Sequence, residues 1–270
     1  SSGYSDGLIL VAEDVETNQK IAREMITMLG YEVDIANNGK EAIQMFTDKD
    51  YDLVFMDCQI PVIDGYGATE EIRRLEMADS KKATPIVALT AGFNKDDRER
   101  CENAGMNHYL TKPFSVSDIQ QVISRFLGTT VKKEIPTQND KKNEGLNILA
   151  KKISGEIFNL SAIENIREVE RQTGRSIVPS IFDGFIAQMD EKLEELSVSL
   201  LANNADSVYR IAHAIKSMSA NIGAEKVRSI SAEIETDGRN NDLSHVKNGI
   251  EELRNAYNEF TKEFDSQYIT

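Results

Sequence analysis

Five polar residues stand where short apolar runs end in the first half of the chain, and their types suit phosphoryl chemistry. Glu13 and Asp14 follow the run LILVA, Asp57 follows DLVFM, Thr90 ends PIVALT, and Lys112 follows HYLT. If these runs are parallel strands of one open sheet, their carboxyl ends border the crevice where such sheets bind ligands. We therefore expect the five side chains to meet in one pocket.

Three carboxylates in one pocket repel each other, and a hard divalent cation relieves that repulsion. Mg²⁺ takes oxygen ligands, keeps several waters and shares a phosphate readily, so we expect it as the cofactor. Asp57 could then act as a carboxylate nucleophile toward a phosphoryl group. Lys112 would balance charge on the transferred oxygens, and the Thr90 hydroxyl would donate a hydrogen bond to one of them. A single strand-end acid, by contrast, more often caps the next helix.

A histidine in the second half, His213 in the segment HAIKSMSANIGA, is a second candidate for phosphoryl chemistry. A helical wheel places it away from an apolar stripe, so we expect its imidazole to face solvent. Ser217 and Ala220 follow it as small residues, while Arg210 and Lys216 bring positive charge. Such cations suit a nucleophile that carries a phosphoryl group, because they stabilise the dianionic product and keep the imidazole neutral. The alternative is an ordinary solvated surface histidine.

The pattern up to about Gly128 alternates five apolar runs of strand length with amphipathic helical stretches. This alternation predicts an α/β fold, a doubly wound five-stranded parallel sheet, over residues 7–128. The polar stretch TTVKKEIPTQNDKKNEG follows and predicts a linker over residues 129–153.

The remaining residues, 154–267, carry no strand signal. Four apolar stripes at helical spacing are joined by the short connections LANNA, NIGA and GRNND. This pattern predicts an all-α, antiparallel four-helix bundle, with a shorter helix around Ala162 to Val169 packed across one end.

The composition excludes several classes of function. A length of 270 residues suits two domains, and a net charge of −14 argues against nucleic-acid binding and against anionic membrane surfaces. The run LILVA is far too short to span a bilayer. Cys58 and Cys101 suggest neither a disulfide framework nor a zinc site, so we expect a reducing, cytoplasmic location, on a parent protein that could be anchored in the inner membrane.

The segments EDVETNQ, FMDCQIPVIDG, ALTAG and YLTKPF resemble the four signature segments of response-regulator receiver domains. The resemblance implies a flavodoxin-like fold in which Asp57 is the phosphoacceptor. It also implies that Mg²⁺ is held by Glu13, Asp14, Asp57 and the backbone carbonyl of Gln59. By the same resemblance, Lys112 and Thr90 contact the phosphoryl group, Tyr109 swings inward on activation, and the Lys112–Pro113 bond is cis.

The segment HAIKSMSANIGA is similar to the phosphohistidine motif of histidine phosphotransfer (HPt) domains. This resemblance makes His213 the phosphorylated residue, Lys216 its electrostatic partner and Gly223 the residue that ends the helix. Ser217 departs from the family, where glycine is frequent, although serine is also small.

Together the two resemblances imply the C-terminal part of a hybrid sensor histidine kinase. We expect Asp57 to exchange a phosphoryl group with His213, within one chain or between two, and His213 to pass it to a separate response regulator. A kinase domain, on the same parent chain or another, would supply the group, since no nucleotide-binding loop is evident. The alternatives are a phosphate sink with reversed flow, a phosphohydrolase, which Gln59 disfavours, and a non-phosphorylated scaffold.

Overall fold

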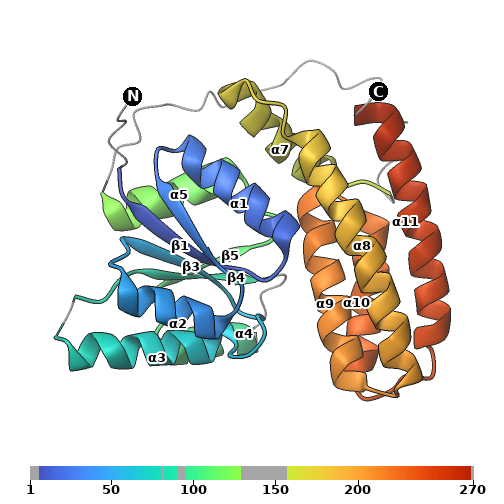
Figure 1. Ribbon diagram of the computed structural model, residues 1–270, viewed down its shortest axis with the longest axis horizontal. Helices are drawn as coiled ribbons and strands as arrows, with labels where there is room; N and C mark the ends of the chain where they lie inside the picture. The colour runs from blue at the N-terminus through green and yellow to red at the C-terminus, as the bar shows by residue number, and fades with distance from the viewer. Residues whose placement is uncertain (1–5, 81, 91–94, 129–156, 269–270) are drawn as a thin grey trace. The chain divides into compact units, whose positions relative to one another are not determined.

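The computed structural model describes residues 6–80, 82–90, 95–128 and 157–268 of the chain. They belong to two compact units, which are described separately here as unit one, up to residue 128, and unit two, from residue 157 (Figure 1). The predicted linker at 129–153 lies outside the described residues, so the predicted domain limits stay predictions.

Unit one is built on a five-stranded sheet in which every neighbouring pair of strands is parallel. Its strands follow the predicted apolar runs and are β1 (Leu8–Ala12), β2 (Glu32–Ala36), β3 (Leu53–Asp57), β4 (Ile86–Thr90) and β5 (His108–Thr111). The strand order is β2-β1-β3-β4-β5, so the winding reverses between β1 and β3. This confirms the predicted doubly wound fold and places its ligand crevice beyond the ends of β1 and β3.

Five helices cover the two faces of this sheet. They are α1 (Glu16–Met28), α2 (Gly39–Asp48), α3 (Gly65–Ala78), α4 (Lys95–Ala104) and α5 (Val116–Leu127). Helices α1 and α5 lie on one face, and α2, α3 and α4 lie on the other (Figure 1). Because both faces are covered, the interior strand β1 is apolar throughout, and its residues Ile9, Leu10 and Val11 are all fully buried.

Side-chain caps define where α2, α3 and α5 of unit one begin. The Asn38 side chain accepts a hydrogen bond from the Glu41 amide at the start of α2, and Asp64 accepts one from Gly67 at the start of α3. Ser115 starts α5 with a reciprocal capping box. These caps satisfy amides that have no partner within the helix, and they fix the chain as it leaves the carboxyl end of the sheet.

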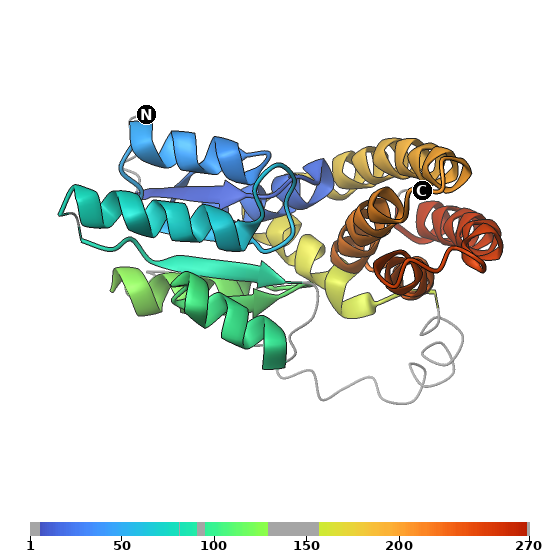
Figure 2. The same ribbon diagram turned by 90° about the horizontal axis from the view of Figure 1, so that it is seen from below.

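Unit two is helical, as predicted. Its helices are α7 (Leu160–Thr173), α8 (Val178–Leu201), α9 (Ala205–Ile222), α10 (Glu225–Arg239) and α11 (Val246–Tyr268). Figures 1 and 2 show the four long helices α8 to α11 side by side, and α7 contacts α8 and α9. In the described part of the chain, no helix combines the length and the apolar character needed to cross a membrane.

The core of unit two contains a cluster of phenylalanines between α8 and α11. Phe182 stacks on Phe264 with ring centroids 4.4 Å apart, and Phe260 lies 5.6 Å from Phe185 with its ring edge-on. All four side chains are buried. Pairs of this geometry add to the stability that their buried area already provides, so they fix how α8 packs against α11.

A two-residue turn joins α9 to α10. Gly223 ends α9 in the left-handed conformation, with φ of 81°, as the sequence predicted for this residue. Its carbonyl accepts a hydrogen bond from the Asn159 amide at 2.8 Å, just before α7 begins. The turn therefore makes α9 and α10 a tight helical hairpin.

Candidate functional site

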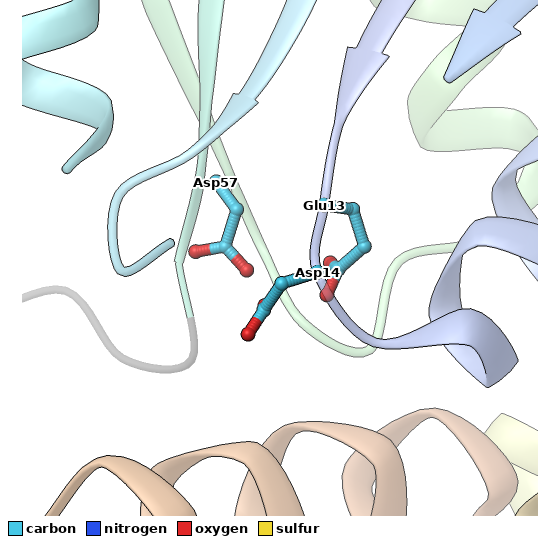
Figure 3. A group of neighbouring side chains, drawn as sticks. All are labelled: Glu13, Asp14 and Asp57. Atoms are coloured by element: carbon cyan, nitrogen blue, oxygen red, sulfur yellow. The ribbon is translucent and has the colours of Figure 1, made fainter. Parts of the chain in front are cut away.

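Unit one brings together the three acids that the sequence placed at strand ends. Glu13 and Asp14 directly follow β1, and Asp57 is the last residue of β3 (Figure 3). One oxygen of each carboxylate lies within 4.8 Å of an oxygen of the other two. Since β1 and β3 are adjacent and parallel, their carboxyl ends bring these side chains to the same edge of the sheet.

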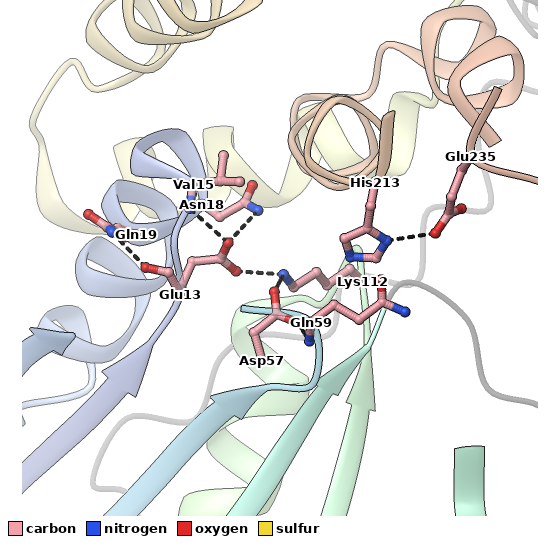
Figure 4. Close-up of polar contacts among 9 residues, drawn as sticks. All are labelled: Glu13, Val15, Asn18, Gln19, Asp57, Gln59, Lys112, His213 and Glu235. Atoms are coloured by element: carbon pink, nitrogen blue, oxygen red, sulfur yellow. Dashed lines mark hydrogen bonds and ion pairs between the residues drawn. The ribbon is translucent and has the colours of Figure 1, made fainter. Parts of the chain in front are cut away.

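The predicted lysine lies in the same cluster. The Lys112 Nζ is 2.5 Å from Oε2 of Glu13 and 2.5 Å from Oδ2 of Asp57 (Figure 4). Burial alone would lower the pKa of Lys112, but the two carboxylates raise it above its ordinary value. Lys112 is therefore positively charged and lies directly beside the expected phosphoacceptor.

Glu13 is held by more groups than the sequence predicted. Its Oε1 accepts hydrogen bonds from the Val15 amide and from Nδ2 of Asn18, both at 3.1 Å. Gln19 donates to the backbone carbonyl of Glu13 at 2.6 Å. The Glu13 side chain is thus tied to the first turn of α1 and also contributes a carboxylate to the cluster. Asn18 and Gln19, which support Glu13, are the last two residues of the segment EDVETNQ. Nothing in the sequence indicated this role beyond their being polar residues in the first turn of the helix.

The electrostatics of the cluster favour a cation. Burial, with the charges of Asp57 and Asp14, raises the pKa of Glu13 to about 8, although Lys112 acts in the opposite direction. Even with Glu13 protonated, Asp14 and Asp57 carry more negative charge than the one ammonium of Lys112 balances, and the side-chain atoms that all three acids offer to a metal are oxygens. A hard, oxygen-seeking ion such as Mg²⁺ fits this donor set.

The other residues predicted for this site lie around the same edge. The Gln59 amide donates to Oδ1 of Asp57 at 2.9 Å. Thr90 ends β4, and its carbonyl accepts the Lys112 amide at 2.7 Å. The Tyr109 side chain is 38% exposed, and the Lys112–Pro113 bond is cis, as the family resemblance implied.

Unit two carries the second candidate site, on α9. Nδ1 of His213 lies 2.8 Å from Oε1 of Glu235 on α10 (Figure 4). Lys216, one turn further along α9, forms an ion pair with the other oxygen of the same carboxylate. One glutamate on α10 therefore joins the two residues that the sequence singled out on α9.

The charge of Glu235 decides which nitrogen of His213 carries the proton. Burial acts to raise the pKa of Glu235, but His213 and Lys216 outweigh it and bring the pKa to about 2. An ionised carboxylate can only accept hydrogen bonds, so Nδ1 must be the donor. The lone pair of the neutral imidazole is then on Nε2.

The structure corrects two expectations about the surroundings of His213. The imidazole was expected to face solvent, but its Nδ1 edge turns onto Glu235. Arg210 was expected to bring positive charge, but it pairs with Asp206 at 2.9 Å. The positive charge expected from Arg210 comes instead from Arg239, which lies 3.5 Å from Oε1 of Glu235. The helical wheel failed because it describes α9 alone, whereas Glu235 and Arg239 come from α10.

Comparison with known proteins agrees with this division into two units. Residues 9–124 match the family model of the response regulator receiver domain, and residues 180–262 match that of the Hpt domain. The "Aerobic respiration control sensor protein ArcB" of Escherichia coli (strain K12) is 28% identical over 251 residues. That match covers 92% of this chain but only 30% of ArcB, so the chain spans less than a third of its relative.

Further relatives match the first unit. "Hybrid signal transduction histidine kinase B" of Dictyostelium discoideum is 41% identical over 128 residues, which cover 44% of this chain and 6% of that protein. A solved receiver domain of the sensor histidine kinase PA1611 from Pseudomonas aeruginosa PAO1, with a magnesium ion in its active-site cleft, is 40% identical. It covers 46% of this chain and 98% of its own, with a TM-score of 0.41. By the two family models, residues 9–124 belong to the response regulator receiver family and residues 180–262 to the Hpt family, so the chain joins in one polypeptide two modules of two-component signalling.

Proposed function

We propose that Asp57 accepts a phosphoryl group from a histidine kinase, exchanges it with His213, and that His213 passes it to a separate response regulator. The observation that carries this proposal is the meeting of Glu13, Asp14, Asp57 and Lys112 at one edge of the sheet. An aspartate in such a cluster can act as a nucleophile toward phosphorus.

In the first step an oxygen of the Asp57 carboxylate attacks the phosphorus of a phosphohistidine on the kinase. The new P–O bond forms as the P–N bond breaks, and the departing imidazole keeps the electron pair. Lys112 stabilises the charge on the transferred oxygens, because its ammonium already lies beside Asp57. The Thr90 hydroxyl would donate a hydrogen bond to one of those oxygens.

Glu13, Asp14, Asp57 and the Gln59 carbonyl are the groups that would hold Mg²⁺. When bound, the ion balances the excess negative charge of the acids and of the incoming phosphoryl group. Glu13 is fixed by Val15, Asn18 and Lys112, so its carboxylate is oriented before any ligand arrives.

In the second step Nε2 of His213 attacks the phosphorus of phospho-Asp57. The P–N bond forms as the P–O bond breaks, which restores the Asp57 carboxylate. Glu235 holds the proton on Nδ1 and so leaves the lone pair on Nε2. Lys216 lies one turn from His213 and can stabilise the phosphoryl oxygens.

We propose that the protein is cytoplasmic, on the basis of the state of its two cysteines. Cys58 and Cys101, the two cysteines of the chain, are both free thiols and buried. Unpaired thiols are typical of a reducing compartment. The kinase that supplies the phosphoryl group is either part of the same parent protein or a separate protein.

The test is phosphorylation of the whole chain by acetyl phosphate or by a phosphorylated kinase domain, with and without Mg²⁺. Intact mass and acid or base lability would be followed in wild type, Asp57→Asn and His213→Ala. We expect label to need Asp57 and Mg²⁺, and then to reach His213. Label on His213 in Asp57→Asn would indicate independent loading and favour the sink with reversed flow. No label on either residue would favour a scaffold.

A further inference from the structure

The backbones of helices α9 and α10 approach each other closely at Gly238, one helical turn from the His213–Glu235 contact. A Cβ atom built on Gly238 would lie 2.7 Å from the backbone nitrogen of Tyr209 and 2.9 Å from its Cα. It would also lie 3.1 Å from the carbonyl oxygen of Ala205. All three atoms belong to the main chain of α9, so they cannot move aside without moving the helix. Any side chain at position 238 must therefore push α10 away from α9.

This contact and the His213–Glu235 hydrogen bond lie on the same faces of α9 and α10, one helical turn apart. Gly238 follows Glu235 by three residues on α10, and Tyr209 precedes His213 by four residues on α9. Residues three or four apart share one face of a helix. Because the two helices are antiparallel neighbours, the two contacts are successive turns of one interface.

The opposite end of the hairpin is too far away to set the helix spacing at His213. The Gly223–Ala224 turn lies about 15 Å from His213 along the helix axis, at about 1.5 Å for each residue. A small change in the angle between the helices would open a gap at that distance. The backbone contact at Gly238, one turn away, is the nearer constraint on the separation.

The hydrogen bond has little tolerance for a change in that separation. His213 Nδ1 and Glu235 Oε1 are 2.8 Å apart, and a gap near 3.6 Å is no longer a hydrogen bond. Relieving a contact of 2.7 Å to ordinary van der Waals distance requires about 1 Å of movement. That movement is enough to break the bond between His213 and Glu235.

We propose that Gly238 is a positioning residue for phosphoryl transfer at His213: by carrying no side chain, it sets the α9–α10 spacing at which Glu235 holds Nδ1 of His213. With Gly238 replaced, Nδ1 loses its acceptor, the proton is shared between the two ring nitrogens, and the lone pair is less often on Nε2. This inference deepens the proposed function and rests on it for the role of His213. Gly238 itself touches neither the imidazole nor the phosphoryl group.

The experiment compares Gly238→Ala with Gly249→Ala in the full chain. Gly249 is also helical, but a Cβ there would meet only the Ile234 side chain, at 3.0 and 3.3 Å. The first readout is the protonation pattern of the His213 ring in two-bond ¹H–¹⁵N spectra, assigned with His213→Ala. The second is the rate of transfer between Asp57 and His213. We expect Gly238→Ala to lose the Nδ1–H form and to slow transfer about tenfold or more, while Gly249→Ala matches wild type.

A further variant separates positioning from folding. Glu235→Asp keeps Gly238 and the helix spacing but shortens the reach of the carboxylate, so it should give the same change in the ring spectrum in a protein that still folds. An unchanged ring spectrum in Gly238→Ala would overturn the proposal. A Gly238→Ala protein that no longer folds would overturn it too, because the glycine would then be needed for folding of the hairpin and not for positioning Glu235. Absence of label on His213 in wild type would count against the proposed function. The ring spectra would still test whether Gly238 sets the hydrogen bond between His213 and Glu235.

Discussion

His213 and Glu235 face each other across α9 and α10, with Nδ1 of the imidazole 2.8 Å from Oε1 of the carboxylate. The second oxygen of that carboxylate is paired with Lys216, so one acid orients the nucleophile and also holds the nearest cation. A phosphoryl group on Nε2 would compete with Glu235 for Lys216. The site therefore keeps the charge of Lys216 balanced until the negative phosphoryl group arrives.

The first prediction concerns the pH dependence of Glu235. Its pKa is near 4.5 in the unfolded chain and about 2 in the folded protein. The stability that this difference contributes is fully present above about pH 4.5 and is lost as the pH falls toward 2. After allowance for solvent screening, we expect it to be on the order of 2 kcal/mol. Urea unfolding of the helical unit, followed by far-UV circular dichroism between pH 2 and 6, measures it.

Glu235→Gln is the control for this prediction, since the amide does not titrate. The difference in unfolding free energy between wild type and Glu235→Gln should grow from pH 2 to about 4.5 and remain level above that. A difference that does not change with pH would show that Glu235 titrates alike in the folded and unfolded states.

The second prediction concerns metal binding by the acidic cluster. Asp14 is the exposed member of the three acids, and its removal reduces their repulsion. We expect Asp14→Asn to raise the melting temperature of unit one in EDTA and to abolish the further rise that Mg²⁺ gives wild type. Calorimetry of the full chain with EDTA or Mg²⁺ checks both effects. Asp79→Asn, an exposed acid at the end of α3, should keep the wild-type response; an equal Mg²⁺ response in Asp14→Asn would contradict the site.

The third prediction concerns backbone strain in the loop after Asp57. Val62 has a φ of 71° in a γ-turn closed by the Ile63 amide and the Pro61 carbonyl at 2.9 Å. A β-branched residue in this region is strained, and Val62 is 71% exposed, so its side chain gains little from packing. Val62→Asn should stabilise unit one by about 1 kcal/mol.

The measurement is the unfolding temperature of unit one, which should rise by roughly 4 °C. Val198→Asn is the matched control, because Val198 is 59% exposed within the regular helix α8. Valine and asparagine have similar helix propensities, so this change should alter stability by less than about 0.5 kcal/mol. A fall in stability with Val62→Asn would mean that the valine side chain contributes packing that outweighs the strain.

The fourth prediction compares two glycines that end helices in unit two. Gly174 and Gly223 both have positive φ, but a Cβ on Gly174 would meet nothing within 4 Å. A Cβ on Gly223 would lie 2.6 Å from the carbonyl oxygen of Asn159. Gly174→Ala should cost about 1 kcal/mol, from backbone conformation alone, and Gly223→Ala about 2–3 kcal/mol. Urea denaturation of both variants checks the difference; equal costs would show that the start of α7 moves aside freely.

Local sequence was sufficient for the elements and for the acids of unit one. The runs LILVA and LVFM are apolar at every position because both faces of a parallel sheet are covered, and each is followed by its acids. The residue after such a run must lie at the carboxyl edge, so the sequence alone places Glu13, Asp14, Asp57 and Lys112 together. The strand order that makes β1 and β3 adjacent was supplied by the fold class.

The hydrogen-bond partners of these residues could not be predicted from the sequence. Asn18 supports Glu13 from within a helix whose other positions follow ordinary amphipathic spacing, so its role was not evident from the pattern. Arg210 and Arg239 illustrate the same limit in unit two. Both are cations on the two helices that form the site. Arg210 donates a hydrogen bond to Asp206, whereas Arg239 lies beside Glu235.

By itself the sequence determined two modules, the helices and strands of each, and the two candidate phosphoacceptors, because strand ends and helix faces follow from local periodicity. Only the tertiary structure decided the state of His213. Its acceptor Glu235 and the spacing glycine Gly238 lie on another helix, and no pattern within α9 carries information about them. Contacts between elements depend on how closely two backbones approach, and that distance is a property of the packed hairpin.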